Sequence, residues 1–245
     1  MLSCYIEPPL NPYDTLENMH VYAQDLIKKL EKLQQDKQLS QLERAGIRYT
    51  HALGIRIPTL RAMAKELGTQ HNVAVQLWES EYHEAKLLAT LLADPEKITE
   101  AVMEHWVQTF YSWDICDQAI QNVFEKVPMA WDKACEWSFR QREFEKRAGF
   151  VLMARLAISD KKTDDKKFEV FFPYLLEGAT DERNFVKKAV NWAIRQIGKR
   201  SMYLNKQCMK LCGQIRKLDN KAAQWIVKDA LRELTDPKTV ARIKR

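Results

Sequence analysis

Apolar residues recur every three or four positions along almost the whole chain, which is the spacing of a helix face. Short polar turns separate these segments, and no stretch alternates as a series of strands would. The pattern predicts an all-α fold. We expect helices near residues 15–37, 58–67, 70–79, 82–93, 96–110, 113–126, 129–140, 142–159, 165–178, 183–199, 202–214 and 219–233.

A weak internal repeat runs through these helices: an alanine in an early helical turn, followed by apolar residues. It occurs at Ala85, Ala119, Ala148, Ala189 and Ala222, at separations of 34, 29, 41 and 33 residues. That spacing is the length of a helix pair in HEAT-like repeats, and stacked pairs form a curved α-solenoid whose concave face binds partners. No low-complexity linker divides the chain. We therefore expect one HEAT-like domain over residues 1–245, with a helical cap at about residues 1–50.

Charge is distributed unevenly along the chain. The net charge of the 245 residues is +6, yet residues 181–245 carry 17 Lys and Arg against 6 Asp and Glu, a net of +11. The rest of the chain is mildly acidic. A basic C-terminal third on an acidic body predicts a surface for a polyanion, most commonly nucleic acid. The alternative is a solvated lysine-rich surface without a ligand.

Cysteine usage and apolar runs indicate a soluble, cytoplasmic protein without a membrane partner. The five cysteines show no disulfide pattern, and the longest apolar run, residues 148–154, is too short to span a bilayer. Cys208 and Cys212 share a helix face with no further ligand nearby, so we interpret them as core thiols. Because P-loop, GxGxxG, HExxH, CxxC and GxSxG motifs are absent, the sequence predicts neither a metal nor a nucleotide cofactor.

The segment Ser112–Asp117 contains the most informative carboxylate. On a helix, one stripe carries Trp113, Asp117, Ile120 and Phe124. Ser112 suits the N-cap, and Asp114 in the first turn suits the helix dipole. Asp117 has no such local explanation, because a carboxylate on an apolar stripe needs a cation, strong hydrogen bonds or a catalytic role. A buried ion pair with a distant arginine is the alternative.

An arginine on an almost wholly apolar helix is the second unusual feature. Arg147 begins the segment that runs to Ile158, which reads as a central helix of the stack. A buried arginine must be paired. It could satisfy Asp117 or hold a phosphate in bidentate fashion, and the sequence does not separate these roles.

The segment after Thr180 predicts an amphipathic helix with a basic aromatic face. Val186, Val190, Ala193 and Ile197 form its apolar stripe, and opposite them lie Lys188, Trp192, Arg195 and Lys199. Cations interleaved with an aromatic ring are typical of surfaces that track a nucleic-acid backbone. The alternative is that Trp192 packs on the neighbouring repeat while the cations are merely solvated.

Several of these motifs together resemble the AlkD-type DNA alkylation repair family. The motifs are Gly54–Arg61, Trp113–Asp117, Arg147-Ala148 and Lys187–Arg195, in the family's order over roughly residues 50–233. The resemblance implies a HEAT-like α-solenoid that grips the DNA backbone in a basic concave groove. It also implies a monomeric, cofactor-independent enzyme that hydrolyses the N-glycosidic bond of N3- or N7-alkylated purines in duplex DNA, without flipping the lesion into a pocket.

The resemblance assigns roles to individual residues. Asp117 matches the catalytic aspartate, Trp113 and Trp192 match the tryptophans that flank the lesion's deoxyribose, and Arg147 matches a nearby arginine. Expected DNA contacts are Lys188, Arg195, Lys199, Arg56 and Arg61. Three positions depart from better-known members and bear on lesion preference: Ala45, Arg56 and Ser112. Because fold does not fix function, the alternative is a non-catalytic HEAT-like DNA-binding or protein-interaction scaffold.

Overall fold

The computed structural model describes residues 16–243, with side chains from residue 20 onward. Within that part, the regular elements are all helices, apart from one isolated bridge between His51 and Tyr82. Cys4 and the start of the expected N-terminal cap lie outside the described residues. The chain divides into two compact units, one ending at Asp94 and one beginning at Pro95. The expectation of a single repeat domain stays a prediction.

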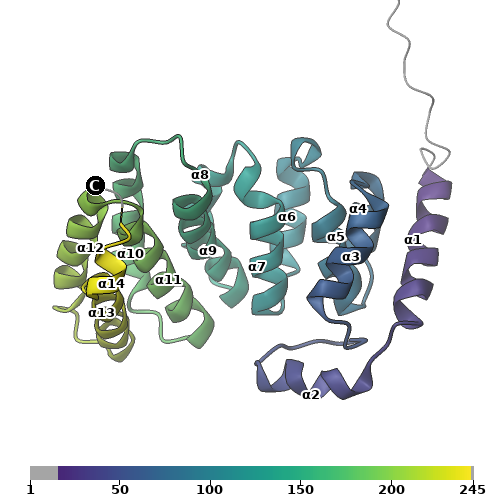
Figure 1. Cartoon of the computed structure of the whole chain (residues 1–245), viewed down its shortest axis with the longest axis horizontal. Coiled ribbons are helices and arrows are strands. Elements are labelled where there is room, and N and C mark those ends of the chain that lie inside the picture. The colour runs from purple at the N-terminus through teal and green to yellow at the C-terminus, as the bar shows by residue number, and fades with distance from the viewer. Residues whose placement is uncertain (1–15, 244–245) are drawn as a thin grey trace, which may run out of the picture. The chain divides into compact units, whose positions relative to one another are not determined.

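The first unit contains five described helices (Figure 1): α1 (Leu16–Glu31), α2 (Asp36–Arg44), α3 (Ile57–Leu67), α4 (His71–Trp78) and α5 (His83–Leu92). Helix α4 packs on α5, α1 contacts α4, and α3 contacts α5. The helix expected over residues 15–37 ends early, at Glu31. The backbone N–H of Gln35 donates to the carbonyl of Leu53 at 2.7 Å, which separates α2 from α1.

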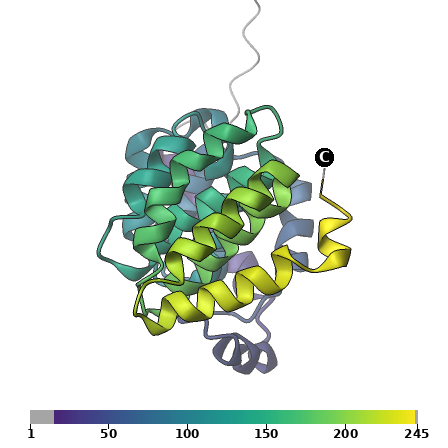
Figure 2. The same ribbon diagram turned by 90° about the vertical axis from the view of Figure 1, so that its left-hand side faces the viewer.

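The second unit contains the remaining helices: α6 (Glu100–Gln108), α7 (Trp113–Asn122), α8 (Ala130–Trp137), α9 (Glu143–Ser159), α10 (Phe172–Gly178), α11 (Asn184–Arg200), α12 (Met202–Ile215), α13 (Lys221–Leu234) and α14 (Pro237–Val240). Helices α7, α9, α11 and α13 contact one another in chain order. Helix α8 packs on α9, and α12 packs on α11 and α13. Figure 2 shows the C-terminal helices of this stack side by side.

The predicted repeat corresponds to this stacking. Four of its alanines, Ala119, Ala148, Ala189 and Ala222, lie buried in α7, α9, α11 and α13, and Ala85 is buried in α5. A small side chain at this position lets the next helix approach closely. A close approach of this kind is found at Gly149 of α9, where a Cβ would clash with the backbone at the end of α8. The all-α, HEAT-like repeat architecture expected from the sequence is confirmed.

Other predicted helices are interrupted as well. The segment expected over residues 113–126 leaves the helix at Val123, whose φ of −128° is not helical, and continues as a short 3₁₀ turn at Phe124–Lys126. The segment expected over 165–178 begins as a 3₁₀ helix, Asp165–Phe171, and becomes α10 only where Pro173 occupies a first-turn position. Proline lacks an N–H, so it is tolerated at that position. None of the described helices is long and apolar enough to cross a membrane.

Candidate functional site

Asp117 and Arg147 form a two-pronged ion pair between α7 and α9. The Nε of Arg147 donates to Oδ1 of Asp117 at 2.9 Å, and Nη2 donates to Oδ2 at 2.8 Å. This fork matches the plane of the carboxylate and fixes its orientation. The structure therefore supplies the partner that the sequence required for Asp117, and it assigns Arg147 to that carboxylate.

Arg147 is anchored on a third helix as well. Its Nη1 donates to the carbonyl of Phe185, at the start of α11, at 2.7 Å. The guanidinium thus links α7, α9 and α11. The Arg147 side chain is 7% exposed and the Asp117 side chain 19%, so the carboxylate is the more accessible member of the pair.

Burial and the ion pair act in opposite directions on the protonation of Asp117. Burial raises the pKa of the Asp117 carboxyl above its ordinary value of 3.8, and the neighbouring Arg147 guanidinium opposes part of that rise. The carboxylate is consequently a partly desolvated anion whose charge is stabilised mainly by Arg147. This arrangement can stabilise a developing positive charge placed beside it.

The start of α7 differs in detail from the sequence expectation. Ser112 occupies the N-cap position, but its side chain does not cap a backbone N–H. Its hydroxyl donates instead to Oδ1 of Asp114 at 2.6 Å, and both residues are buried. Trp113 is half-buried and lies one helical turn before Asp117, on the same side of α7.

The basic aromatic face of α11 is less open than the helical pattern predicts. Lys188 is exposed, whereas Trp192, Arg195 and Lys199 are half-buried. The side-chain amide oxygen of Gln196 faces Trp192 and accepts a hydrogen bond from its indole Nε1 at 2.9 Å. The reason for the burial is that α13 packs along this side of α11.

Two acidic residues of α13 bind polar side chains of α11. Glu233 accepts ion pairs from Nη1 of Arg195 and from Nζ of Lys199, each at 2.5 Å, and Asp229 accepts from Nδ2 of Asn191 at 2.7 Å. Neither carboxylate was predicted from the sequence. The only signal is that each lies 34 or 38 residues after its partner, near the repeat length.

Arg56 and Arg61 belong to the first unit, so the structure does not place them relative to the other predicted site residues. Both are exposed, on either side of the start of α3. The loop before Arg56 is held by the buried Glu84 of α5, whose carboxylate accepts from the backbone N–H of Leu53 at 2.8 Å and of Ile55 at 3.2 Å. Glu84 therefore has a structural role that positions this motif.

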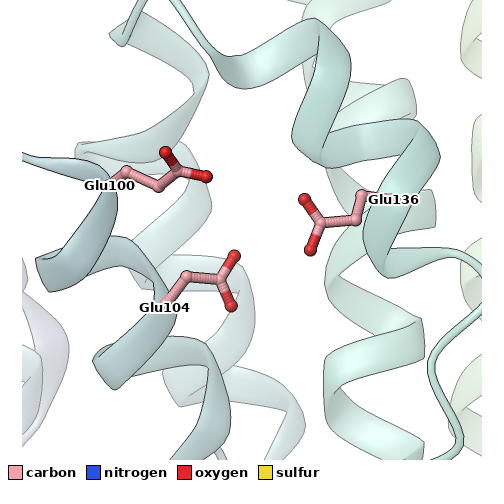
Figure 3. Close-up of side chains that lie close together, drawn as sticks. All are labelled: Glu100, Glu104 and Glu136. Carbon is pink, nitrogen blue, oxygen red and sulfur yellow. The ribbon is translucent and has the colours of Figure 1, made fainter.

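A group of three glutamates on α6 and α8, Glu100, Glu104 and Glu136, is arranged like a set of metal ligands (Figure 3). The Nζ of Lys133 lies among them, at 2.6 Å from Glu100, 2.9 Å from Glu104 and 2.6 Å from Glu136. An ammonium group already balances the charge that a cation would balance. We interpret this cluster as an ion network that joins α6 to α8.

Comparisons with known proteins agree with the fold and its repeats. The chain matches the DNA alkylation repair enzyme family over residues 26–237. One solved structure shares 18% sequence identity, with a TM-score of 0.70 over 85% of this chain and 94% of that chain. It is described as a member of a new family related to the HEAT-like repeat DNA glycosylases, with affinity for branched DNA structures. No curated protein matches the sequence. The chain belongs to the DNA alkylation repair enzyme family.

Proposed function

We propose that this protein is a monomeric DNA glycosylase that hydrolyses the N-glycosidic bond of N3- or N7-alkylated purines in duplex DNA, without base flipping and without a cofactor. One observation carries the proposal: the Asp117 carboxylate is locked in orientation by the Arg147 fork and is still the accessible member of that pair. A preoriented, partly desolvated carboxylate is the group that such a reaction requires.

The chemistry follows from the charge of the substrate. An N3- or N7-alkylated purine is cationic, so the bond from C1′ to the base nitrogen breaks with its electron pair going to the base, which leaves as a neutral molecule. The sugar becomes an oxocarbenium ion. Asp117 would stabilise that ion, and the faces of Trp113 and Trp192 would add cation–π attraction. Water then adds to C1′ and loses a proton.

The duplex would be held by its backbone. Lys188, Arg195, Lys199, Arg56 and Arg61 are the cations proposed to contact phosphates, which favours binding without reading sequence. Lys188, Arg56 and Arg61 are exposed, and none has a hydrogen-bond or ion-pair partner among the described side chains. Arg195 and Lys199 would exchange Glu233 for phosphate.

Release of free base from methylated DNA tests the proposal directly. DNA containing 7-methylguanine or 3-methyladenine is incubated with the protein, and the released base is measured by chromatography. Asp117→Asn should lower the excision rate by about 10²–10³-fold while duplex binding is retained, because a preoriented charge is removed and the fold of the site is kept.

Glu125→Gln is the matched control. Glu125 forms the same two-pronged pair with Arg155 of α9, with distances of 2.6 and 3.0 Å, but its side chain is only 5% exposed. We expect excision by Glu125→Gln to stay within a few-fold of the wild-type rate per folded molecule. Failure of the wild-type protein to release any alkylpurine at stoichiometric amounts would refute the enzymatic proposal.

A second candidate is a non-catalytic DNA-binding repeat protein. It is favoured by the engagement of both Asp117 oxygens in hydrogen bonds from Arg147. The solved structure that resembles this chain is described by its affinity for branched DNA. If this candidate is right, Asp117→Asn lowers stability without an activity to lose, and the wild-type protein binds branched DNA more tightly than an unbranched duplex.

A further inference from the structure

Trp225 of α13 is exposed although the helix around it is built into the core. All seven tryptophans lie in the described part of the chain, and Trp225 is the one that is exposed, at 38%. Its neighbours Ala222, Ala223, Ile226 and Val227 are buried. The core therefore does not require an indole at this position, and the exposed ring is accessible to a ligand.

One lysine lies over the ring, and two more flank Trp225 along α13. The Nζ of Lys187, on α11, lies 5.0 Å from the centre of the indole, within the range of a cation–π contact. On α13, Lys221 and Lys228 lie one turn before and one turn after Trp225 and are exposed. We call these four residues, Lys187, Lys221, Trp225 and Lys228, the Trp225 face.

The Trp225 face is distinct from the ion pairs farther along the same two helices. Beyond it, the α11 side chains meet carboxylates: Asn191 bonds Asp229, and Arg195 and Lys199 pair with Glu233. Lys187 instead meets an aromatic ring. Neither Lys221 nor Lys228 has a hydrogen-bond or ion-pair partner among the described residues. Their charge is therefore available to an anionic ligand.

We infer that the Trp225 face binds an unpaired nucleotide, with the base stacked on the free side of the Trp225 ring and the flanking phosphates neutralised by the lysines. Every base has a π-face, so an exposed ring between cations suits single-stranded DNA of any sequence. A paired base inside a duplex offers only its edges, so duplex DNA would use the lysines without the ring. The inference rests on the proposed contact with DNA and adds a second, base-stacking site to it.

Fluorescence anisotropy with three fluorescein-labelled probes tests the inference. The probes are a short oligothymidylate, a chain of abasic nucleotides with the same number of phosphates, and a duplex. The full-length wild-type protein should bind oligothymidylate more tightly than the abasic chain, because only the former can stack. Trp225→Ala should weaken oligothymidylate binding by roughly five- to hundredfold and make the two single-stranded probes equivalent.

Tyr203→Ala is the matched control, because Tyr203 of α12 is an aromatic residue with the same 38% exposure. It should leave all three affinities unchanged, and Trp225→Phe should retain most of the preference for bases. Equal binding of the oligothymidylate and the abasic chain by the wild-type protein would overturn the inference. So would an unchanged oligothymidylate affinity in Trp225→Ala.

The outcome is separable from the proposed glycosylase activity. Trp225→Ala should excise alkylpurine from duplex DNA at close to the wild-type rate, since Trp225 is not part of the Asp117 site. A wild-type protein that releases no alkylpurine, yet prefers bases to abasic nucleotides through Trp225, would refute the glycosylase and support the stacking site.

Discussion

Two ion pairs link α9 to the chain before it, one to α7 and one to the 3₁₀ turn Phe124–Lys126, and they have the same connectivity and opposite exposure. Asp117 with Arg147 and Glu125 with Arg155 are each separated by 30 residues, and each arginine uses Nε and Nη2 on both carboxylate oxygens. In the first pair the Asp117 side chain is 19% exposed and the Arg147 side chain 7%. In the second the Glu125 side chain is 5% exposed and the Arg155 side chain 17%.

The difference indicates which pair is available for chemistry. In the Glu125 pair the more accessible group is the guanidinium, which has no means of stabilising a cationic sugar. In the Asp117 pair the more accessible group is the anion, and its arginine is also tied to the Phe185 carbonyl. Exposure therefore distinguishes two otherwise similar ion pairs, and it makes the Asp117 pair the candidate for a reaction.

The largest effect is expected from removing either arginine. Arg147→Met and Arg155→Met each leave a buried carboxylate without its cation, which typically costs about 3–5 kcal/mol. Urea unfolding at neutral pH measures this loss. The two variants should differ in activity: excision per folded molecule should fall for Arg147→Met and persist for Arg155→Met. Equal excision by both would break the distinction between the pairs.

Much of this arrangement was predictable from the sequence because helix periodicity is local. The helices, the repeated alanines and the need of Asp117 for a partner all follow from spacing and from the cost of burying charge. Arg147 was also predicted as one possible partner.

The contacts of Glu233 and Asp229 were not predictable, because they depend on the register of α11 against α13 across 34 to 38 residues. The hydrogen bonds from the backbone of Leu53 and Ile55 to Glu84 span a similarly large sequence separation. The roles proposed for Trp113, Trp192 and the DNA-contacting cations stay predictions.

The reactivity of Cys116, which precedes Asp117 in the chain, should report whether the Asp117–Arg147 ion pair stays formed. Cys116 is fully buried, and burial raises the pKa of its thiol well above the ordinary value of 9.0. Its labelling by iodoacetamide, followed by peptide mass spectrometry, should be at least about tenfold slower than that of the half-buried Cys135, since only an exposed thiolate reacts. Arg147→Met should speed labelling of Cys116 and leave the buried Cys212 as it was. Fast labelling of Cys116 in the wild-type protein would contradict an Asp117–Arg147 ion pair that stays formed.

Acid should affect the Asp117 pair and the glutamate network of α6 and α8 differently. Burial would raise the pKa of Glu104, but hydrogen bonds from Lys133, Trp137 and Arg140 hold it below 4.5. A carboxyl with a lowered pKa stabilises the fold at neutral pH, and that contribution is lost as the pH falls through its folded value. The raised pKa of Asp117 has the opposite sign, so its protonation does not drive acid unfolding.

Excision and stability should therefore depend on different carboxyl groups in acid. Thermal unfolding followed by circular dichroism should show Tm falling below about pH 4.5, and Glu104→Gln should make that fall shallower. The pH at which the excision rate declines should stay the same in Glu104→Gln, because Asp117 and not Glu104 sets it. A shift of both profiles together in Glu104→Gln would show that Asp117 is not the group that titrates.

The smallest effect concerns the cations of α11. If this face contacts DNA, the logarithm of the binding constant should change by about −0.9 per phosphate for each unit of log salt. Lys188 is exposed and without a partner among the described residues, so Lys188→Ala should flatten the salt slope by about one contact.

Arg195 and Lys199 are already paired with Glu233, so their contribution to DNA binding depends on releasing that carboxylate. Glu233→Gln should accordingly tighten duplex binding, whereas replacing Lys188, Arg195 and Lys199 together should flatten the slope by up to about three contacts. An unchanged slope in that triple variant would mean that DNA binds elsewhere on the repeat.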